Sequence, residues 1–265
     1  MNLDLTGKNA FVSGGSKGIG KAIAFELASL GANVTVAART ETDLIDTVVQ
    51  LNIRSSPFQQ HDYIVADYSD PDKLRSALNK YQRKHNRIYH ILVNNAGGPP
   101  QGLIAEAEEE AFLSAFNTHL LCNHLLVKSF LEGMKAAHYG RIINIISTSV
   151  KQPLPNLGVS NTIRGAVASW AKTLANELGR YGITVNNVLP GATETERLAT
   201  IITNKSKKLA VEESQVEQEM KAEVPAKRFA KPEETAFAVG FLASPSAAYI
   251  NGINLPVDGG RTSSL

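Results

Sequence analysis

A glycine-rich turn at residues 13–20, Ser-Gly-Gly-Ser-Lys-Gly-Ile-Gly, constrains the fold of this chain more than any other segment. A strand-like apolar run at residues 9–12 leads into the turn, and a helical pattern of apolar residues follows it. Gly31 ends that helical pattern, and residues 33–37 form a second strand-like run. A strand, a glycine turn, a helix and a second strand form the βαβ unit of a dinucleotide site.

The glycines of this turn have separate expected tasks. Gly14 permits a tight turn, Gly18 lets the backbone approach a diphosphate, and Gly20 lets the helix pack closely on the strand. The start of the helix then offers free N–H groups and a positive dipole end to phosphate. A glycine cluster alone is also compatible with a flexible loop, but the strand before it and the helix after it favour the nucleotide site. The turn residues expected at the cofactor are Gly14, Ser16, Lys17, Gly18, Ile19 and Gly20.

Strand and helix patterns alternate along the rest of the chain. Strands are predicted at 9–12, 33–37, 63–66, 90–93, 141–146 and 183–189, with a last turn and strand at 251–260. A loop at 39–43 is predicted to lead into a helix that ends near residue 52, and further helices are predicted at 71–85, 106–134, 160–179 and 232–243. This alternation predicts an α/β fold, a single Rossmann-type doubly wound parallel sheet flanked by helices, over residues 1–265. Ligands of such sheets bind at the carboxyl ends of the strands.

Residues 196–230 differ in character from the rest of the chain. They are rich in Lys, Glu, Gln and Ala and show no strand pattern. We expect one or two mobile helices that form a lid over the substrate, because long excursions in compact domains often have this role. A surface excursion without a role is the alternative.

Composition excludes several other classes of function. The net charge of +2 indicates neither a nucleic-acid partner nor an acidic one, and the single cysteine, Cys122, excludes an intrachain disulfide and a multi-cysteine metal site. The N-terminus has no signal-peptide pattern, and no apolar run is long enough to span a membrane. We therefore expect a cytoplasmic protein with a small-molecule substrate, without a metal site and without a membrane partner.

The polar strand ends, taken together, resemble the short-chain dehydrogenase/reductase family over essentially the whole chain. The matching motifs are Ser13-Gly14-x-x-x-Gly18-Ile19-Gly20, Asp67, Asn94-Asn95-Ala96-Gly97, Asn117, Ser147, Pro190-Gly191 with Thr195, and Val257-Asp258-Gly259-Gly260. Each motif is weak alone, but their joint order and spacing are specific. The sequence looks most like the 3-oxoacyl-acyl-carrier-protein reductases of this family.

The resemblance implies a set of further cofactor contacts. Asp67 would accept a hydrogen bond from the adenine amino group, backbone at Asn95, Ala96 and Gly97 would line the cofactor, and Thr195 would hold the nicotinamide carboxamide. The other residues placed at the cofactor by this resemblance are Arg39, Thr40, Tyr68, Arg164, Pro190, Gly191 and Thr193.

The end of the second predicted strand indicates which nicotinamide cofactor is used. Dehydrogenases that prefer NAD place an acid there to bind the ribose hydroxyls. This chain has Ala38 followed by Arg39, and Lys17 adds a second cation from the glycine turn. Two cations and no acid predict NADP(H), because they match its 2′-phosphate.

The expected catalytic residues depart from the family pattern. The family has a Tyr thirteen residues after the catalytic Ser and a Lys four residues further on, but these places hold Ser160 and Arg164 when counted from Ser147. A serine hydroxyl is a much weaker acid than a tyrosine whose pKa is lowered by a cation, and an arginine stays charged. Ser160 is alternatively a helix N-cap, and Arg164 is either a ribose or phosphate ligand or a member of a surface ion pair.

Asn117 and Ser147 remain at the family's positions. The resemblance implies that Ser147 hydrogen-bonds the substrate carbonyl and that Asn117 holds a water molecule. Lys151, on the loop after Ser147, could polarise a carbonyl or be a solvated loop lysine. His119 is two residues beyond Asn117, a helical spacing that predicts a different direction for its side chain.

Three functional hypotheses follow. The first is an NADP(H)-dependent oxidoreductase that reduces a carbonyl, 3-oxoacyl-like or another ketone, with the atypical set Asn117, Ser147, Ser160 and Arg164. The second is a weakly active or inactive NADP(H)-binding sensor or assembly protein. The third is reduction of an activated double bond with a proton from water or substrate. The resemblance also implies a homotetramer through the two long helices, although the sequence does not separate a tetramer from a dimer.

Overall fold

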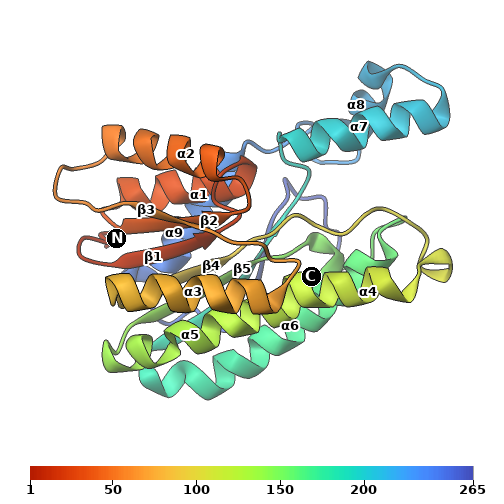
Figure 1. Cartoon of the computed structure of the whole chain (residues 1–265). Coiled ribbons are helices and arrows are strands. Elements are labelled where there is room, and N and C mark those ends of the chain that lie inside the picture. Colours follow the sequence, from red (N-terminus) through yellow and green to blue (C-terminus); the bar gives the residue numbers. More distant parts are fainter. Residues whose placement is uncertain (265) are drawn as a thin grey trace.

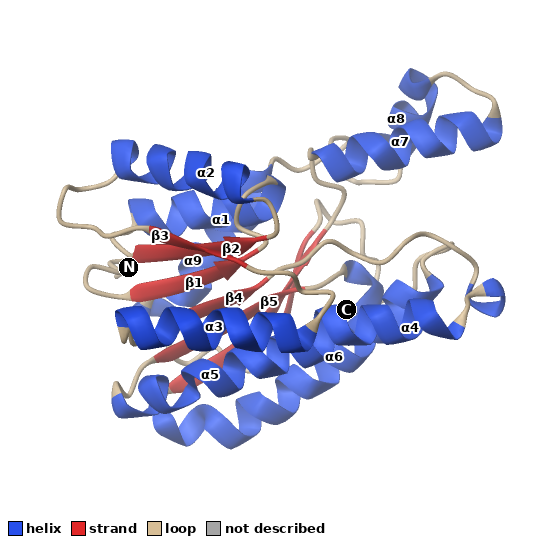
Figure 2. Ribbon diagram, in the orientation of Figure 1, coloured by secondary structure: helices blue, strands red, loops and turns tan. Residues whose placement is uncertain are grey.

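The computed structural model describes residues 1–264 and contains one seven-stranded, fully parallel sheet (Figure 1, Figure 2). The strand order is β3-β2-β1-β4-β5-β6-β7. The strands are β1 (Asn9–Ser13), β2 (Asn33–Ala38), β3 (Asp62–Val65), β4 (Ile91–Asn94), β5 (Gly140–Ile145), β6 (Ile183–Pro190) and β7 (Asn254–Val257). The prediction of a Rossmann-type doubly wound parallel sheet is confirmed.

Helices cover both faces of this sheet (Figure 2). One face packs against α1 (Gly18–Ser29), α2 (Glu41–Arg54) and α9 (Pro232–Ala243), whose buried residues share one apolar core with the strands. The other face packs against α3 (Pro71–His85), α5 (Cys122–Ala136) and α6 (Gly158–Leu178) in a second core. Burial on both faces explains why the central strands are continuous apolar runs.

The chain reverses its direction of winding beside β1. This strand lies between β2 and β4, so the connections on its two sides leave in opposite directions and open a crevice at the carboxyl ends. The glycine turn follows β1, and the Asn-Asn-Ala-Gly segment spans the end of β4. The sheet therefore brings the two strongest sequence motifs to one crevice.

A row of asparagine side chains crosses the sheet through four neighbouring strands. Asn94, Asn144, Asn187 and Asn254 are paired in register on β4, β5, β6 and β7. Each amide donates to the carbonyl oxygen of the next, over 2.8, 2.8 and 2.7 Å. The first three side chains are almost fully buried. These bonds connect β4, β5, β6 and β7 through their side chains, in addition to the backbone hydrogen bonds of the sheet.

Two predictions about helices are wrong in detail. The helix predicted at 106–134 is divided into α4 (Glu109–Phe116), a π-helical turn at Asn117–Leu121, and α5. The helix predicted from residue 160 begins at Gly158, where a Cβ would lie 2.5 Å from the Cβ of Ile104. α6 therefore begins where Gly158 packs closely against Ile104, although no side chain caps the helix there.

The segment expected to form a lid contains α7 (Glu196–Leu209) and α8 (Glu213–Ala222), which extend from the carboxyl end of the sheet (Figure 1). The two helices have a small apolar core of their own, made by Leu198, Ile202, Val216 and Phe229. This separate core lets the segment hold its shape with little support from the sheet. No helix within residues 1–264 has the length and apolar content to cross a bilayer.

Candidate functional site

The glycine turn has the backbone geometry that the sequence predicts. Gly14 and Gly18 have φ angles of 59° and 51°, in the left-handed region that favours glycine. A Cβ on Gly20 would lie 2.0 Å from the backbone oxygen of Gly14, which only a hydrogen atom can accommodate. These glycines therefore let α1 begin directly against the end of β1.

The start of α1 is open to an anion. Lys17 precedes the helix and makes no side-chain capping bond, and the first turn carries no acid. The N–H groups of this turn, which have no partner within the helix, and the positive end of the helix dipole both favour a bound phosphate. The geometry thus fits the diphosphate of a dinucleotide, with Ser16, Gly18 and Ile19 beside it in the chain.

The ends of β1 and β4 are joined by hydrogen bonds. The Ser13 hydroxyl donates to the Val93 oxygen over 3.0 Å and accepts from the Asn95 N–H over 2.9 Å. The Asn95 amide donates to the backbone oxygens of Ser13 and Gly14 over 3.2 and 3.3 Å. These bonds fix the position of Asn95, and its side-chain amide binds the backbone of the glycine turn. A Cβ on Gly97, two residues later, would meet open space.

The ends of β2 and β3 place polar groups at the edge of this crevice. The Asp67 carboxylate accepts from the Ser69 N–H and hydroxyl over 3.0 and 2.8 Å, and the bond from the backbone is the main cause of its lowered pKa. Arg39 adds a smaller effect on the same pKa, so the two residues are near each other. Thr40 precedes α2 and makes no capping bond with its side chain.

Two residues at this edge differ from the expectation. Lys17 pairs with Asp43 over 3.2 Å and approaches Glu196 to 3.9 Å, so part of its charge is already balanced, whereas Arg39 makes no ion pair within residues 1–264. The Tyr68 side chain is buried in the core of α3 and α5. A cofactor contact from Tyr68 would therefore come from its backbone.

The segment after β6 returns to the glycine turn. The Thr195 hydroxyl accepts from the Leu198 N–H over 3.3 Å and so caps α7, while the Thr193 hydroxyl donates to the Gly191 oxygen over 3.1 Å. The Thr195 side chain would be 3.2 Å from a Cβ on Gly18. Pro190, Gly191, Thr193 and Thr195 therefore lie on the segment that leads from β6 to the glycine turn.

Ser147 lies just after β5, at the carboxyl end of the sheet. Its hydroxyl oxygen accepts from the Ser149 N–H over 3.1 Å, at the start of a short 3-10 turn at Thr148–Val150. Because the oxygen accepts this bond, the hydroxyl proton is directed away from it and is strengthened as a donor. Lys151 ends this turn and is half-buried.

Ser160 and Arg164 lie on the first two turns of α6, which packs against the 3-10 turn after Ser147. The N-cap interpretation of Ser160 is wrong, because Leu157 holds the cap position and Ser160 is inside the helix, almost fully buried. The surface ion-pair interpretation of Arg164 is also wrong: its side chain is buried and donates to the Ile145 oxygen over 3.0 Å.

The π-helical turn presents a further group to the site. It begins at Asn117, and turns of this type are frequent at functional sites. His119, expected to point elsewhere, is buried beside the Gly97 backbone and close enough to Arg164 and Arg197 for their charges to affect it. Burial, then these charges, lower the pKa of His119 to about 2, so the imidazole is neutral.

Arg197 is the residue that the sequence interpretation missed. From the first turn of α7 it donates to the Gly98 and Pro99 oxygens over 2.9 and 3.3 Å, which connects α7 to the loop after β4. Burial lowers the pKa of Arg197. Its only sequence signal is an arginine two residues after the expected nicotinamide ligand, Thr195.

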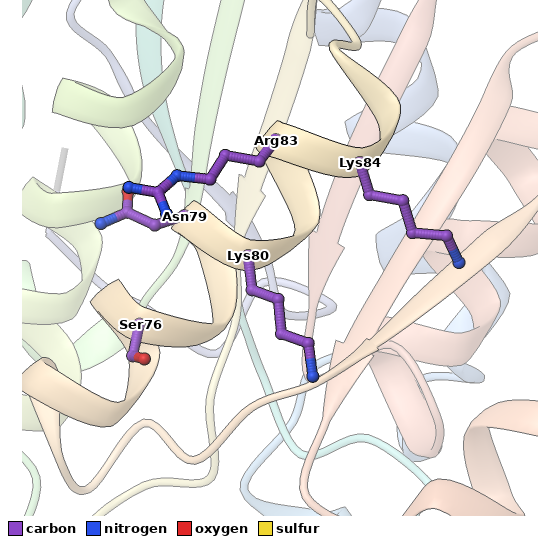
Figure 3. A pocket seen from close by; sticks show the side chains of 5 residues that line it. All are labelled: Ser76, Asn79, Lys80, Arg83 and Lys84. Carbon is purple, nitrogen blue, oxygen red and sulfur yellow. The ribbon is translucent and has the colours of Figure 1, made fainter.

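Two surface depressions lie outside this constellation. One is on α3 and is lined by side chains that point outward from the helix: Ser76, Asn79, Lys80, Arg83 and Lys84 (Figure 3). Another lies under the lid segment and contains the Arg228–Glu234 ion pair. Neither contains Ser147, Ser160 or Arg164.

The fold and the glycine turn define a dinucleotide-binding α/β protein, and comparison with known proteins identifies its family. The family model described as "Enoyl-(Acyl carrier protein) reductase" matches residues 14–262. The chain is 35% identical to the 3-oxoacyl-[acyl-carrier-protein] reductase FabG of Vibrio cholerae over 260 residues, 97% of this chain and 98% of that protein. It therefore belongs to the short-chain dehydrogenase/reductase family of oxidoreductases.

Two further similar proteins are named for their reductase activity. The NADPH-dependent reductase BacG of Bacillus subtilis is 30% identical over 258 residues, 97% of this chain and 99% of that protein. The crystal structure of L-sorbose reductase from Gluconobacter frateurii, complexed with NADPH and L-sorbose, matches with a TM-score of 0.93 and 31% identity over the whole of both chains. The fold of this chain is thus that of a solved reductase.

Proposed function

We propose that this protein is an NADP(H)-dependent oxidoreductase that reduces a carbonyl compound. The chain is similar to a 3-oxoacyl reductase and to L-sorbose reductase, both named for carbonyl substrates, and this similarity supports carbonyl reduction as the reaction. The proposal rests on the placement of two groups at the end of β5. The Ser147 hydroxyl follows the strand and accepts from the Ser149 N–H, and the buried Arg164 cation on α6 donates to the oxygen of Ile145, two residues before Ser147.

The chain's own residues fit a bound NADP(H). The start of α1 would hold the diphosphate, and Asp67 would hold the adenine amino group. Arg39, with Thr40 beside it, would hold the 2′-phosphate. Backbone at Ala96 and Gly97 and the side chain of Thr195 would hold the nicotinamide half. When bound, the cofactor supplies the hydride.

Reduction adds a hydride to the carbonyl carbon and a proton to its oxygen. Ser147 donates a hydrogen bond to that oxygen and stabilises the negative charge that develops on it. Arg164 adds a fixed positive charge nearby. Ser160 is too weak an acid to replace tyrosine, and water is no stronger. Ser147 and Arg164 therefore stabilise the alkoxide until a proton reaches it through the water that Asn117 holds at the π-helical turn. Residues 196–230 act as the lid that excludes bulk solvent.

The test compares Ser147→Ala with Ser160→Ala at saturating NADPH, on the best substrate from a panel of ketones and 3-oxoacyl thioesters. Loss of a donor to a developing oxyanion lowers the rate by about 10²–10³-fold, and we expect this for Ser147→Ala. Ser160→Ala should change the rate little. The assignment is wrong if Ser160→Ala abolishes activity while Ser147→Ala keeps it.

The competing function is a non-catalytic NADP(H)-binding protein, favoured by the missing Tyr and Lys. Unchanged trace activity in both serine variants would support it. Reduction of an activated double bond is tested by including enoyl thioesters in the same panel. The family model's description as an enoyl reductase makes that arm worthwhile.

Cofactor choice follows from Arg39 and the absence of an acid at position 38. A charge-assisted contact to the 2′-phosphate contributes about 1.5–3 kcal/mol, so NADPH should bind about ten- to a hundredfold more tightly than NADH. Calorimetric titration measures both affinities, and Arg39→Gln should remove most of the difference. Equal affinities in the unaltered protein would contradict the assignment.

We also propose that the chain forms a homo-oligomer through α4, α5 and α6. Leu113, Phe116 and Leu121 lie on this face and are 63%, 37% and 39% exposed, which leaves apolar surface that a second copy would cover. Light scattering at micromolar concentration tests this, with a tetramer or dimer expected and a monomer as the contrary result.

A further inference from the structure

Two arginines of the site, Arg164 and Arg197, lie near each other, and neither pairs with a carboxylate of residues 1–264. Arg164 extends from α6 and Arg197 from α7, and neither forms a salt bridge. The charge of Arg197 lowers the pKa of Arg164, and both charges act on His119, so the three groups lie within electrostatic reach of one another. His119 is neutral and balances neither charge.

Arg164 remains charged in this buried position. Burial is the main cause of its lowered pKa, followed by Arg197, and the resulting value of about 10 still leaves the guanidinium protonated at neutral pH. Burial of a cation without a partner anion is costly. A guanidinium also carries five N–H donors, and the one hydrogen bond that this group makes to the described residues, 1–264, is to the Ile145 oxygen. The Arg164 Nε–H is fully buried and has no acceptor within residues 1–264.

Arg141, on β5, is a buried arginine with a structural role and can be compared with Arg164, which donates to Ile145 of the same strand. It lies at the opposite, amino end of β5 and is also buried without a carboxylate. Its guanidinium donates to the Gly140, Gly182 and Ser244 oxygens over 2.8, 3.2 and 3.5 Å and lies 4.1 Å from the centre of the Tyr139 ring. The guanidinium of Arg141 thus has several partners in the described part of the chain, whereas that of Arg164 has one.

We propose that Arg164 and Arg197 form the binding site for a carboxylate of the substrate, so that the substrate class is an oxo acid. This inference rests on the proposed function, since it concerns the same crevice. A carboxylate would accept from the unused N–H groups of Arg164 and balance the two charges, and Arg–carboxylate pairs are often bidentate. A ribose hydroxyl at Arg164 could use one donor but would leave the charge uncompensated.

Arg197 gives this binding site a connection to the lid. It already holds α7 to the Gly98 and Pro99 oxygens, so a carboxylate bound beside it would contact the body of the protein through Arg164 and the lid through Arg197. The anionic group would therefore orient the carbonyl toward Ser147 while it stabilises the closed position of the lid.

The activity test uses pairs of 2-oxobutanoate, 3-oxobutanoate and 4-oxopentanoate with their methyl esters, at saturating NADPH. One acid should exceed its ester in kcat/KM by about ten- to a hundredfold. Arg164→Lys and Arg197→Gln should each reduce that ratio, and Arg141→Lys, the matched control, should not. Thermal unfolding of each variant verifies that it folds.

A binding measurement separates this inference from the reductase proposal. Calorimetry with NADP⁺ present compares butanoate with butanamide, its uncharged counterpart, and needs no turnover. Binding of butanoate that weakens in Arg164→Lys and Arg197→Gln supports the carboxylate site even if no substrate is reduced. Equal weak binding of both compounds overturns it, as does an Arg164→Lys variant that loses NADPH affinity while its acid-to-ester ratio is unchanged.

Discussion

The asparagine row offers a sharp test of how the site is held together, through the variant Asn144→Leu. Asn144 is fully buried and both accepts from Asn94 and donates to Asn187. Leucine has a similar shape but no polar atoms, so the substitution leaves one buried donor and one buried acceptor without partners. Each unpaired group costs about 1–3 kcal/mol, which gives a loss of about 2–6 kcal/mol in the free energy of unfolding.

The matched variant is Asn254→Leu, at the end of the same row. It removes one acceptor only, that of the Asn187 amide, and residue 254 is half-exposed. Its cost should therefore be about 1–3 kcal/mol at most. Urea unfolding at one protein concentration measures both losses from the midpoints and slopes. If Asn144→Leu costs no more than Asn254→Leu, the row does not stabilise the sheet as argued.

Two other perturbations test the cofactor crevice and its buried histidine. Gly20→Ala should abolish NADPH binding in a calorimetric titration, because its Cβ would overlap the Gly14 oxygen, whereas Gly165→Ala, whose Cβ meets no atom within 4 Å, should leave binding unchanged. The pKa of His119 is lowered by folding, so below a pH of about 6.5 the unfolded chain binds a proton that the folded chain does not. The free energy of unfolding therefore decreases as the pH is lowered. Between about pH 6.5 and pH 5 the wild-type protein should lose up to about 1.4 kcal/mol per pH unit more than His119→Gln in urea unfolding, and parallel curves would contradict the burial argument.

The sequence predicts the parts of the fold that local chemistry determines. The Asp70-Pro71 pair is an example, since Asp70 accepts from the Asp72 and Lys73 N–H groups over 3.1 Å and begins α3 where predicted. The apolar strands and the glycine turn are likewise visible in single segments. Their predicted order gives the sheet, because parallel strands connected by helices have few alternatives.

Features that depend on distant contacts are not visible in the same way. The start of α6 depends on the packing of Gly158 against Ile104, and the direction of His119 depends on the π-helical turn, for which the sequence has no separate signal. Arg197 reaches the site only because the lid segment folds back toward Gly98. The spacing from Ser147 finds Arg164, but burial without a counter-charge is a property of the folded chain.

The most direct test of the account is the oxidation of NADPH in the presence of carbonyl substrates, followed at the nicotinamide absorbance band and matched to the alcohol formed. We expect turnover of at least one ketone or oxo acid, with one alcohol formed per NADPH consumed, although Ser160 and Arg164 occupy the family's Tyr and Lys positions. NADPH that binds but is not consumed with any member of the panel would contradict the account.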